Sequence, residues 1–228
     1  MFSFVNCSFF AALLSAVVGQ KTVVRLNQWR LPMRNSSTED TITSSMGTFK
    51  HIQTLRLQDK VSNGSQFGGL SSIIVSDNGS EILTISDSGI FAAMNLSSTD
   101  SESKSYRLTP TRLREIPQVS SSSRDAEGLT MNGSYEGGGR GQLYVSYEKV
   151  HRVLEFPNGT ESRASVNLNV SHLFSECPRR RGLEAILKPR PTAGIDGLLL
   201  MLCEDPSNSS APTTDPQSRI VLPGLPSL

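Results

Sequence analysis

Apolar and polar residues alternate along this chain in a layout that occurs three times. Each copy has a short apolar segment, a polar turn that contains glycine, and a second apolar segment that ends at an acidic residue. This layout is typical of a β-hairpin. The three copies read FGGLSSIIVSDNGSEILTISDSG from Phe67 to Gly89, DAEGLTMNGSYEGGGRGQLYVSYE from Asp125 to Glu148, and RGLEAILKPRPTAGIDGLLLMLCED from Arg181 to Asp205.

The spacing of the copies predicts the fold class. A Gly-Leu step opens each copy, and with Leu70, Leu129 and Leu183 as anchors the spacings are 59 and 54 residues. That is the span of one four-stranded propeller blade with long loops. We therefore predict an all-β chain, a β-propeller of four-stranded blades with three blade motifs visible. The strands expected around these motifs are Ser72 to Val75, Ile90 to Leu96, Leu129 to Met131, Arg152 to Phe156 and Glu184 to Leu187, with earlier strands near Thr22 to Leu26 and Ile52 to Leu57.

Acidic residues recur at the ends of the second strands. In an antiparallel hairpin the end of the second strand lies beside the start of the first, so Asp87, Glu148 and Glu204 should lie near the Gly-Leu openings. Radial stacking of blades would gather them at one end of a channel, where carboxylate oxygens suit Ca²⁺. Taken singly, each acid could instead cap turn amides or face water. Further acids that could join the cluster are Asp125, Glu127, Glu184 and Asp205.

Other polar residues beside these acids are candidates for chemistry. Glu127 or Glu184 could serve as a general base. Arg124, Arg152 and Arg181 could bind an anionic substrate group, or pair with neighbouring carboxylates. His151 could act as an acid or base, although a lone strand histidine is more often structural. A formal charge of +1 argues against a nucleic-acid-binding surface, and no G-x-S-x-G elbow, paired zinc-ligand spacing, P-loop or dinucleotide fingerprint occurs.

The ends of the chain and its sequons predict secretion. Residues 1–19 carry no charged side chain and include an apolar run, which is typical of a signal peptide. Residues 20–205 would form the domain, and the Pro-, Ser- and Thr-rich segment 206–228 a disordered tail. No apolar run is long enough to span a membrane. Eight Asn-X-Ser/Thr sequons follow the leader, and those at Asn63, Asn78, Asn132 and Asn158 open polar turns where glycans are expected.

Two cysteines remain after the leader. Cys177 and Cys203 border neighbouring ends of the third hairpin, so a disulfide between them is expected in an oxidising compartment. Two buried free thiols are the alternative.

Five segments in order resemble the phytase-like family described as having esterase-like activity of phytase, whose members are secreted and bacterial β-propeller proteins. They are FGGLS, TISDSG, DAEGLT with QLYVSYE, KVHRVLEF and RRRGLEAI, between Phe67 and Glu204. The chain departs from the family's usual residues at Ser88 and at Pro178 to Arg180.

The resemblance implies hydrolysis of phosphate or carboxylic esters of a small molecule, assisted by a divalent metal. The alternative is a non-catalytic extracellular propeller that uses its acidic channel for structural calcium or for binding a partner. The resemblance also implies more strands than this chain supplies, so we expect an incomplete ring that exposes apolar strands such as Ile82 to Ile85 and Gly197 to Cys203. The oligomeric state is left open.

Overall fold

The architecture was taken from a computed structural model of the chain. It describes residues 26–31, 41–59, 67–100, 105–116, 125–174, 177, 182–191, 194–195, 197–204 and 220–221. Strands dominate these residues, which also include the short 3-10 helices η3 (Gly159–Glu161) and η4 (Ser171–Phe174). The predicted all-β class is therefore confirmed.

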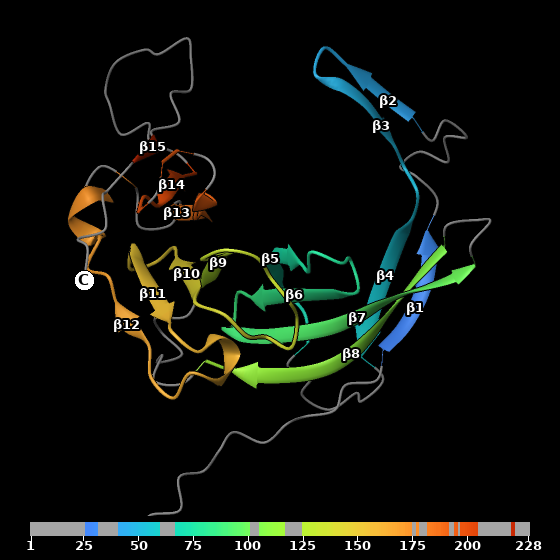
Figure 1. Ribbon diagram of the computed structural model, residues 1–228, viewed down its shortest axis with the longest axis horizontal. Coiled ribbons are helices and arrows are strands. Elements are labelled where there is room, and N and C mark those ends of the chain that lie inside the picture. The colour runs from blue at the N-terminus through green and yellow to red at the C-terminus, as the bar shows by residue number, and fades with distance from the viewer. Residues whose placement is uncertain are drawn as a thin grey trace, which may run out of the picture.

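Three antiparallel sheets carry the hairpin repeats, and within each the strands lie in sequence order (Figure 1). The first two sheets have four strands and the third has three. The first sheet contains β5 (Leu70–Val75), β6 (Glu81–Ser86), β7 (Ile90–Asp100) and β8 (Ser105–Glu115). The second contains β9 (Ala126–Met131), β10 (Leu143–Tyr147), β11 (Arg152–Phe156) and β12 (Val166–Asn167). The third contains β13 (Leu183–Leu187), β14 (Leu200–Cys203) and β15 (Ile220–Val221).

The N-terminal part of the described chain forms two further antiparallel pairs. Strand β1 (Leu26–Leu31) pairs with β4 (Thr54–Asp59), and β2 (Thr41–Ser44) pairs with β3 (Gly47–Lys50). Strand β1 starts where the predicted strand Thr22 to Leu26 was expected to end.

Apolar side chains between neighbouring sheets hold the repeats together. One cluster joins the first sheet to the second, with Leu83 and Ile85 on one side and Val145 on the other. Within it the rings of Phe91 and Phe156 meet edge to face, 5.4 Å apart. Burying each such side chain contributes about 1.5–3 kcal/mol.

A second cluster joins the second sheet to the third, and it includes Tyr144, Val153, Leu199 and Met201. The three sheets thus stack side by side in sequence order around an open arc (Figure 1). The described strands do not close this arc into a ring, so a closed propeller stays a prediction.

Each hairpin has one extra residue in its first strand near the acidic end, which makes a β-bulge. The register shifts between Leu70 and Ser72, between Ala126 and Leu129, and between Leu183 and Ala185. The side chains at these bulges are Ser71, Glu127 and Glu184. Bulges bend a strand and redirect a side chain, and they are frequent next to active sites.

The register corrects our alignment of the repeats. Leu70 pairs with the last residue of its partner strand, and so do Ala126 and Leu183. These three equivalent positions are 56 and 57 residues apart, a more even spacing than the Gly-Leu anchors gave. Leu129 corresponds to Ile73 and not to Leu70, because the second hairpin has an aspartate where the other two have the glycine of the Gly-Leu step.

The expected exposure of two strands was wrong. Residues 82–85 on β6 are buried, as are Met201 and Cys203 on β14. The reason is that the second strand of each hairpin is central in its sheet, and its side chains pack into the apolar clusters on the faces of the sheets. The first strand of each hairpin is an edge strand, and β5 and β13 carry the exposed apolar residues instead.

The ends of the chain are described only in part. The predicted leader 1–19 lies outside the described residues, as does most of the predicted tail. Within that tail, Ile220 and Val221 form β15 and pair with β14, because two adjacent β-branched residues suit a strand. No helix in the described residues has the length and apolar character that a bilayer span requires.

Candidate functional site

The same backbone hydrogen bond fixes the strand-end acid in all three hairpins. The N–H groups of Asp87, Glu148 and Glu204 donate to the residue before their own first strand, at 2.8, 3.0 and 3.0 Å. Their acceptors are the carbonyl oxygens of Gly69, Asp125 and Gly182 respectively. Each acid therefore lies beside the opening of its own hairpin, as the sequence predicted.

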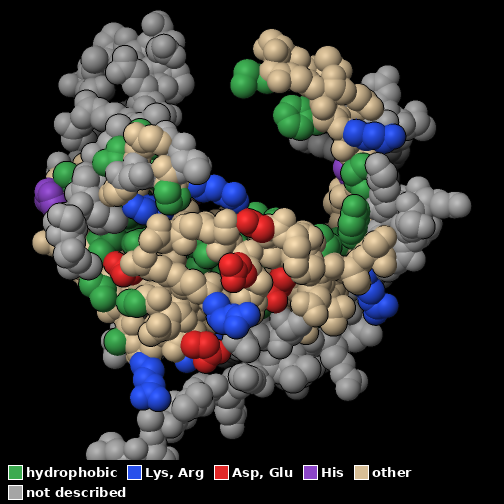
Figure 2. Space-filling model, in the orientation of Figure 1, with side chains coloured by type: hydrophobic (Ala, Val, Ile, Leu, Met, Phe, Trp, Pro, Cys, Tyr) green, Lys and Arg blue, Asp and Glu red, His purple; other side chains and the backbone are tan. Residues whose placement is uncertain are grey.

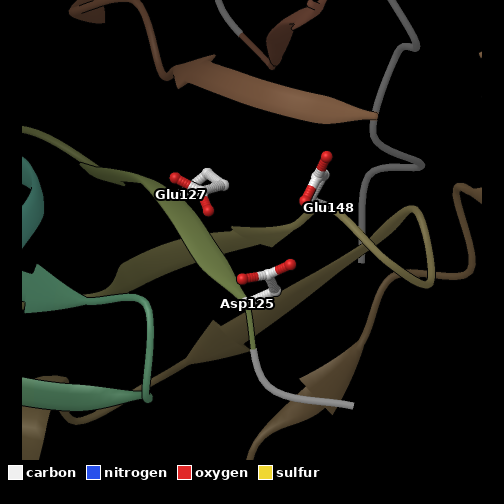
Figure 3. Close-up of side chains that lie close together, drawn as sticks. All are labelled: Asp125, Glu127 and Glu148. Carbon is white, nitrogen blue, oxygen red and sulfur yellow. The ribbon is translucent and has the colours of Figure 1, made fainter. Parts of the chain in front are cut away.

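Five carboxylates from the second and third hairpins form two groups that share a member. Asp125, Glu127 and Glu148 each offer an oxygen within 4.8 Å of the others (Figure 3). Glu148, Glu184 and Glu204 meet the same criterion. Glu148 belongs to both groups, so it links the acids of two neighbouring sheets. Acidic side chains are also visible beside the hollow on the face shown in Figure 2.

The first hairpin contributes differently from the other two. Asp87 is in neither group, and its carboxylate fills the space beside Gly69, where a Cβ would lie 2.5 Å from its Oδ1. Ser71 occupies the bulge position where the other hairpins have glutamate, and its side chain hydrogen-bonds to Glu127. The sequence did not single out Ser71, because only the register reveals that it is equivalent to Glu127 and Glu184.

The carboxylate groups crowd negative charge into a partly buried place. Burial is the main cause that raises the pKa of Glu127 from 4.5 to about 7. The charges of Glu184, Asp125 and Glu148 raise that pKa further, and the hydrogen bond from Ser71 opposes them. A proton or a cation at this place would relieve the repulsion.

The other two glutamates are affected in the same direction. Burial, followed by a hydrogen bond and charge repulsion from Asp125, raises the pKa of Glu148, while the backbone N–H of Gly182 lowers it. Burial and then the charge of Glu204 raise the pKa of Glu184. The exposed side chain of Lys149 lies beside the cluster, with its Nζ 3.0 Å from Asp125 Oδ2.

The backbone is strained at Asp125, and space is tight at the equivalent Gly182. Asp125 has a φ of 131°, which only glycine adopts freely, and it stands where the other hairpins have Gly69 and Gly182. A Cβ at Gly182 would lie 2.6 Å from the carbonyl oxygen of Glu148 and would overlap the ring of His151. Backbone strain at a non-glycine residue such as Asp125 is frequent at functional sites.

His151 lies behind the carboxylates. It is buried, its Nε2 lies 3.1 Å from the carbonyl oxygen of Cys177, and its ring is next to that of Phe174. These contacts favour the structural interpretation, in which the ring supports the turn that follows Glu148.

The three predicted substrate-binding arginines are only partly described. Arg124 and Arg181 lie outside the described residues. The half-buried Arg152 places its guanidinium over the ring of Tyr147, 4.7 Å from the centroid. Tyr147 itself belongs to the apolar cluster between the first and second sheets.

The two cysteines are joined. Cys177 and Cys203 form a disulfide, with their Cα atoms 6.2 Å apart. Because Cys203 directly precedes Glu204, the bridge ties this acid to the segment that carries the acceptor for His151.

Three predicted glycosylation sites lie far from the acids. Asn78, Asn132 and Asn158 are exposed, and each follows a strand at the end opposite the carboxylates. Asn63 lies outside the described residues. Glycans at the three described positions would leave the acidic end accessible.

Together these features define an all-β protein of stacked antiparallel sheets, with an acidic site at the open ends of repeated hairpins. The family described as phytase-like, esterase-like activity of phytase, matches residues 65–222. The chain belongs to this family, as the sequence motifs predicted. No curated protein matches the chain.

Proposed function

We propose that the protein is a secreted ester hydrolase that acts on phosphate or carboxylic esters of small molecules with the help of a divalent metal ion. Membership of the phytase-like family supports a hydrolase-like function. The single observation that supports this chemistry is the cluster of five carboxylates. They form two groups of three, and Glu148 belongs to both groups.

The residues present fit a hard cation. Carboxylate oxygens are the ligands that Ca²⁺ prefers, and it takes six to eight oxygens. Glu148 and Glu204 would hold the ion, with Glu184 completing their group. Asp87 stays a predicted ligand that does not lie within either group. When bound, the ion would polarise an oxygen of the ester.

Glu127 is the best candidate for a general base. A base works well when its pKa is near the working pH, and the pKa of Glu127 is about 7. Its side chain would take a proton from the attacking water, and Ser71 would hold the carboxylate in place. Glu184 remains the alternative base, and Arg124, Arg152 and Arg181 the proposed contacts for an anionic substrate group.

The second candidate function is a non-catalytic extracellular protein that uses the same acids for structural calcium or for a partner. The ring packing of His151 and the disulfide next to Glu204 favour it, because both features would stabilise a purely structural ion site.

The test compares turnover with calcium-dependent stability. Purified secreted protein should hydrolyse a generic phosphomonoester or carboxylic ester, and a chelator should abolish this activity. Glu148→Gln should reduce both activity and the rise in melting temperature that Ca²⁺ causes. Glu127→Gln should reduce activity and leave a calcium-dependent rise in place.

Glu136→Gln is the matched control, because Glu136 is an exposed acid outside both groups. A calcium-dependent rise without turnover on any ester would support the non-catalytic alternative. If neither calcium nor Glu148→Gln changes the turnover or the melting temperature, the proposed metal site is refuted.

A further inference from the structure

His151 makes two contacts directly behind the carboxylates. Its buried ring packs against Gly182, where a Cβ would lie 2.2 Å from the ring's Cε1 and 2.4 Å from its Nδ1. Its backbone N–H donates to the carbonyl oxygen of Glu148 at 3.2 Å and closes the turn that follows β10. His151 therefore contacts Gly182 through its ring and holds the backbone of Glu148 through its N–H.

Gly182 supports two of the acids at once. Its N–H donates to the side chain of Glu148, and this hydrogen bond lowers the pKa of that carboxyl. Its carbonyl oxygen accepts the backbone N–H of Glu204 at 3.0 Å. Glu148 and Glu204 each offer an oxygen within 4.8 Å of the other. A displacement of Gly182 would therefore change the placement of both proposed calcium ligands.

The two ring nitrogens of His151 have different surroundings. Nε2 lies 3.1 Å from the carbonyl oxygen of Cys177, which can only accept, so Nε2 carries a proton. Nδ1 is buried and has no hydrogen-bond partner among the described residues. A buried polar atom without a partner costs free energy that a phenylalanine ring of similar shape would not incur. Packing alone thus does not explain a histidine at this position, and the bond to Cys177 is what the imidazole adds.

The disulfide completes this set of contacts. It joins Cys177, which accepts the hydrogen bond from the His151 ring, to Cys203, the residue before Glu204. We call Cys177, Cys203, His151 and Gly182 together the brace. Because covalent bonds, hydrogen bonds and close packing connect its members, the brace leaves Gly182 little freedom to move.

We propose that His151 is a positioning residue for the metal site. It passes the constraint of the disulfide to Gly182, and Gly182 then holds Glu148 and Glu204 close together. The inference rests on the proposed calcium site and concerns residues that are not themselves ligands. Ligand oxygens that are held in place before the ion arrives need less ordering when it binds. Breaking the brace should therefore weaken calcium binding although every carboxylate is still present.

The test measures the calcium affinity of the full chain by titration calorimetry, and its melting temperature in a chelator. His151→Phe keeps a ring against Gly182 and removes the bond to Cys177, so calcium should bind about tenfold more weakly. Its melting temperature in the chelator should change by no more than about 2 °C, because the lost hydrogen bond and the removed Nδ1 offset each other.

His172→Phe is the matched control. His172 is exposed, and its Nδ1 also lies 3.1 Å from a backbone carbonyl oxygen, that of Asn169. This substitution makes the same change of side chain outside the brace, so it should leave the calcium affinity at the native value.

A variant without the disulfide tests the route. Cys177→Ser combined with Cys203→Ser should also weaken calcium binding about tenfold. Adding His151→Phe to it should weaken binding no further, since both changes break the same brace. If the serine variant does not melt cooperatively, reduction of the native bridge replaces it.

Three results would overturn this proposal alone. They are native calcium affinity in His151→Phe, losses of affinity that multiply when His151→Phe is combined with the serine variant, and a loss of affinity in His151→Phe that comes with a large fall in its melting temperature. A native protein that binds no calcium would refute the proposed metal site, and the positioning role with it.

Discussion

Neutralising Glu127 should make the metal-free protein more stable at alkaline pH. The folded state raises the pKa of this residue from 4.5 to about 7, so folding favours its protonated form. The stability lost through this group therefore grows as the pH rises from about 4.5 through about 7, and it is complete at pH 8. Glu127→Gln removes the ionisable proton with little change of shape.

The size of the effect follows from the shift in pKa. The full shift corresponds to at most about 3 kcal/mol, and partial exposure of the side chain screens it to about 1–2 kcal/mol. For a chain of this length, that stabilisation raises the melting temperature by about 2–8 °C.

Thermal unfolding of the native protein and of Glu127→Gln, in the presence of a chelator at pH 5 and at pH 8, measures this gain in stability. The variant should gain stability at pH 8 and only about a quarter as much at pH 5, where the native carboxyl is protonated in the folded protein and partly ionised in the unfolded chain. Glu136→Gln should change neither value. A variant that is no more stable than the native protein at pH 8, or that gains equally at both pH values, would refute the charge-crowding argument.

Three further results are expected. Treatment with N-glycosidase should lower the apparent mass of protein from a eukaryotic secretory host, and peptide mapping should place glycans on Asn78, Asn132 and Asn158; an unchanged mass would contradict secretion through that pathway. Reducing the Cys177–Cys203 bridge, which spans 26 residues, should cost roughly 3 kcal/mol of stability, whereas freely alkylated thiols in the non-reduced protein would show that it is absent. Gly182→Ala should lower the melting temperature and the calcium response together, since its Cβ has no room beside His151 and Glu148, while Gly194→Ala should leave the calcium response intact because Gly194 faces open space.

The sequence predicted the hairpins and the family, because both depend on local patterns. Alternating apolar residues, glycine turns and strand-end acids are visible without the structure. The hydrogen bonds of Asp87, Glu148 and Glu204 follow directly from hairpin geometry. The features that the sequence predicts correctly therefore lie within single repeats.

The bulges and the exposure of strands could not be predicted in the same way. A bulge adds one residue to a strand and so shifts the alignment of the repeats. The amino-acid sequence therefore does not show that Ser71 is the counterpart of Glu127. The Gly-Leu step misled the alignment because Asp125 holds a glycine-like conformation at the same position. Burial depends on the neighbouring sheets, so Ile73 and Leu129 have similar side chains and opposite exposure.

The hairpin turns and the acids lie at opposite ends of the strands, and this separation offers a route to labelling the protein. The turn between β13 and β14 is exposed at Gly194 and Ile195. It is about 15 Å from the acidic end, the length of a five-residue strand. A fluorophore attached there would follow the rotation of the molecule, and its transfer of energy to a luminescent lanthanide ion would report occupancy of the acidic end without touching a carboxylate.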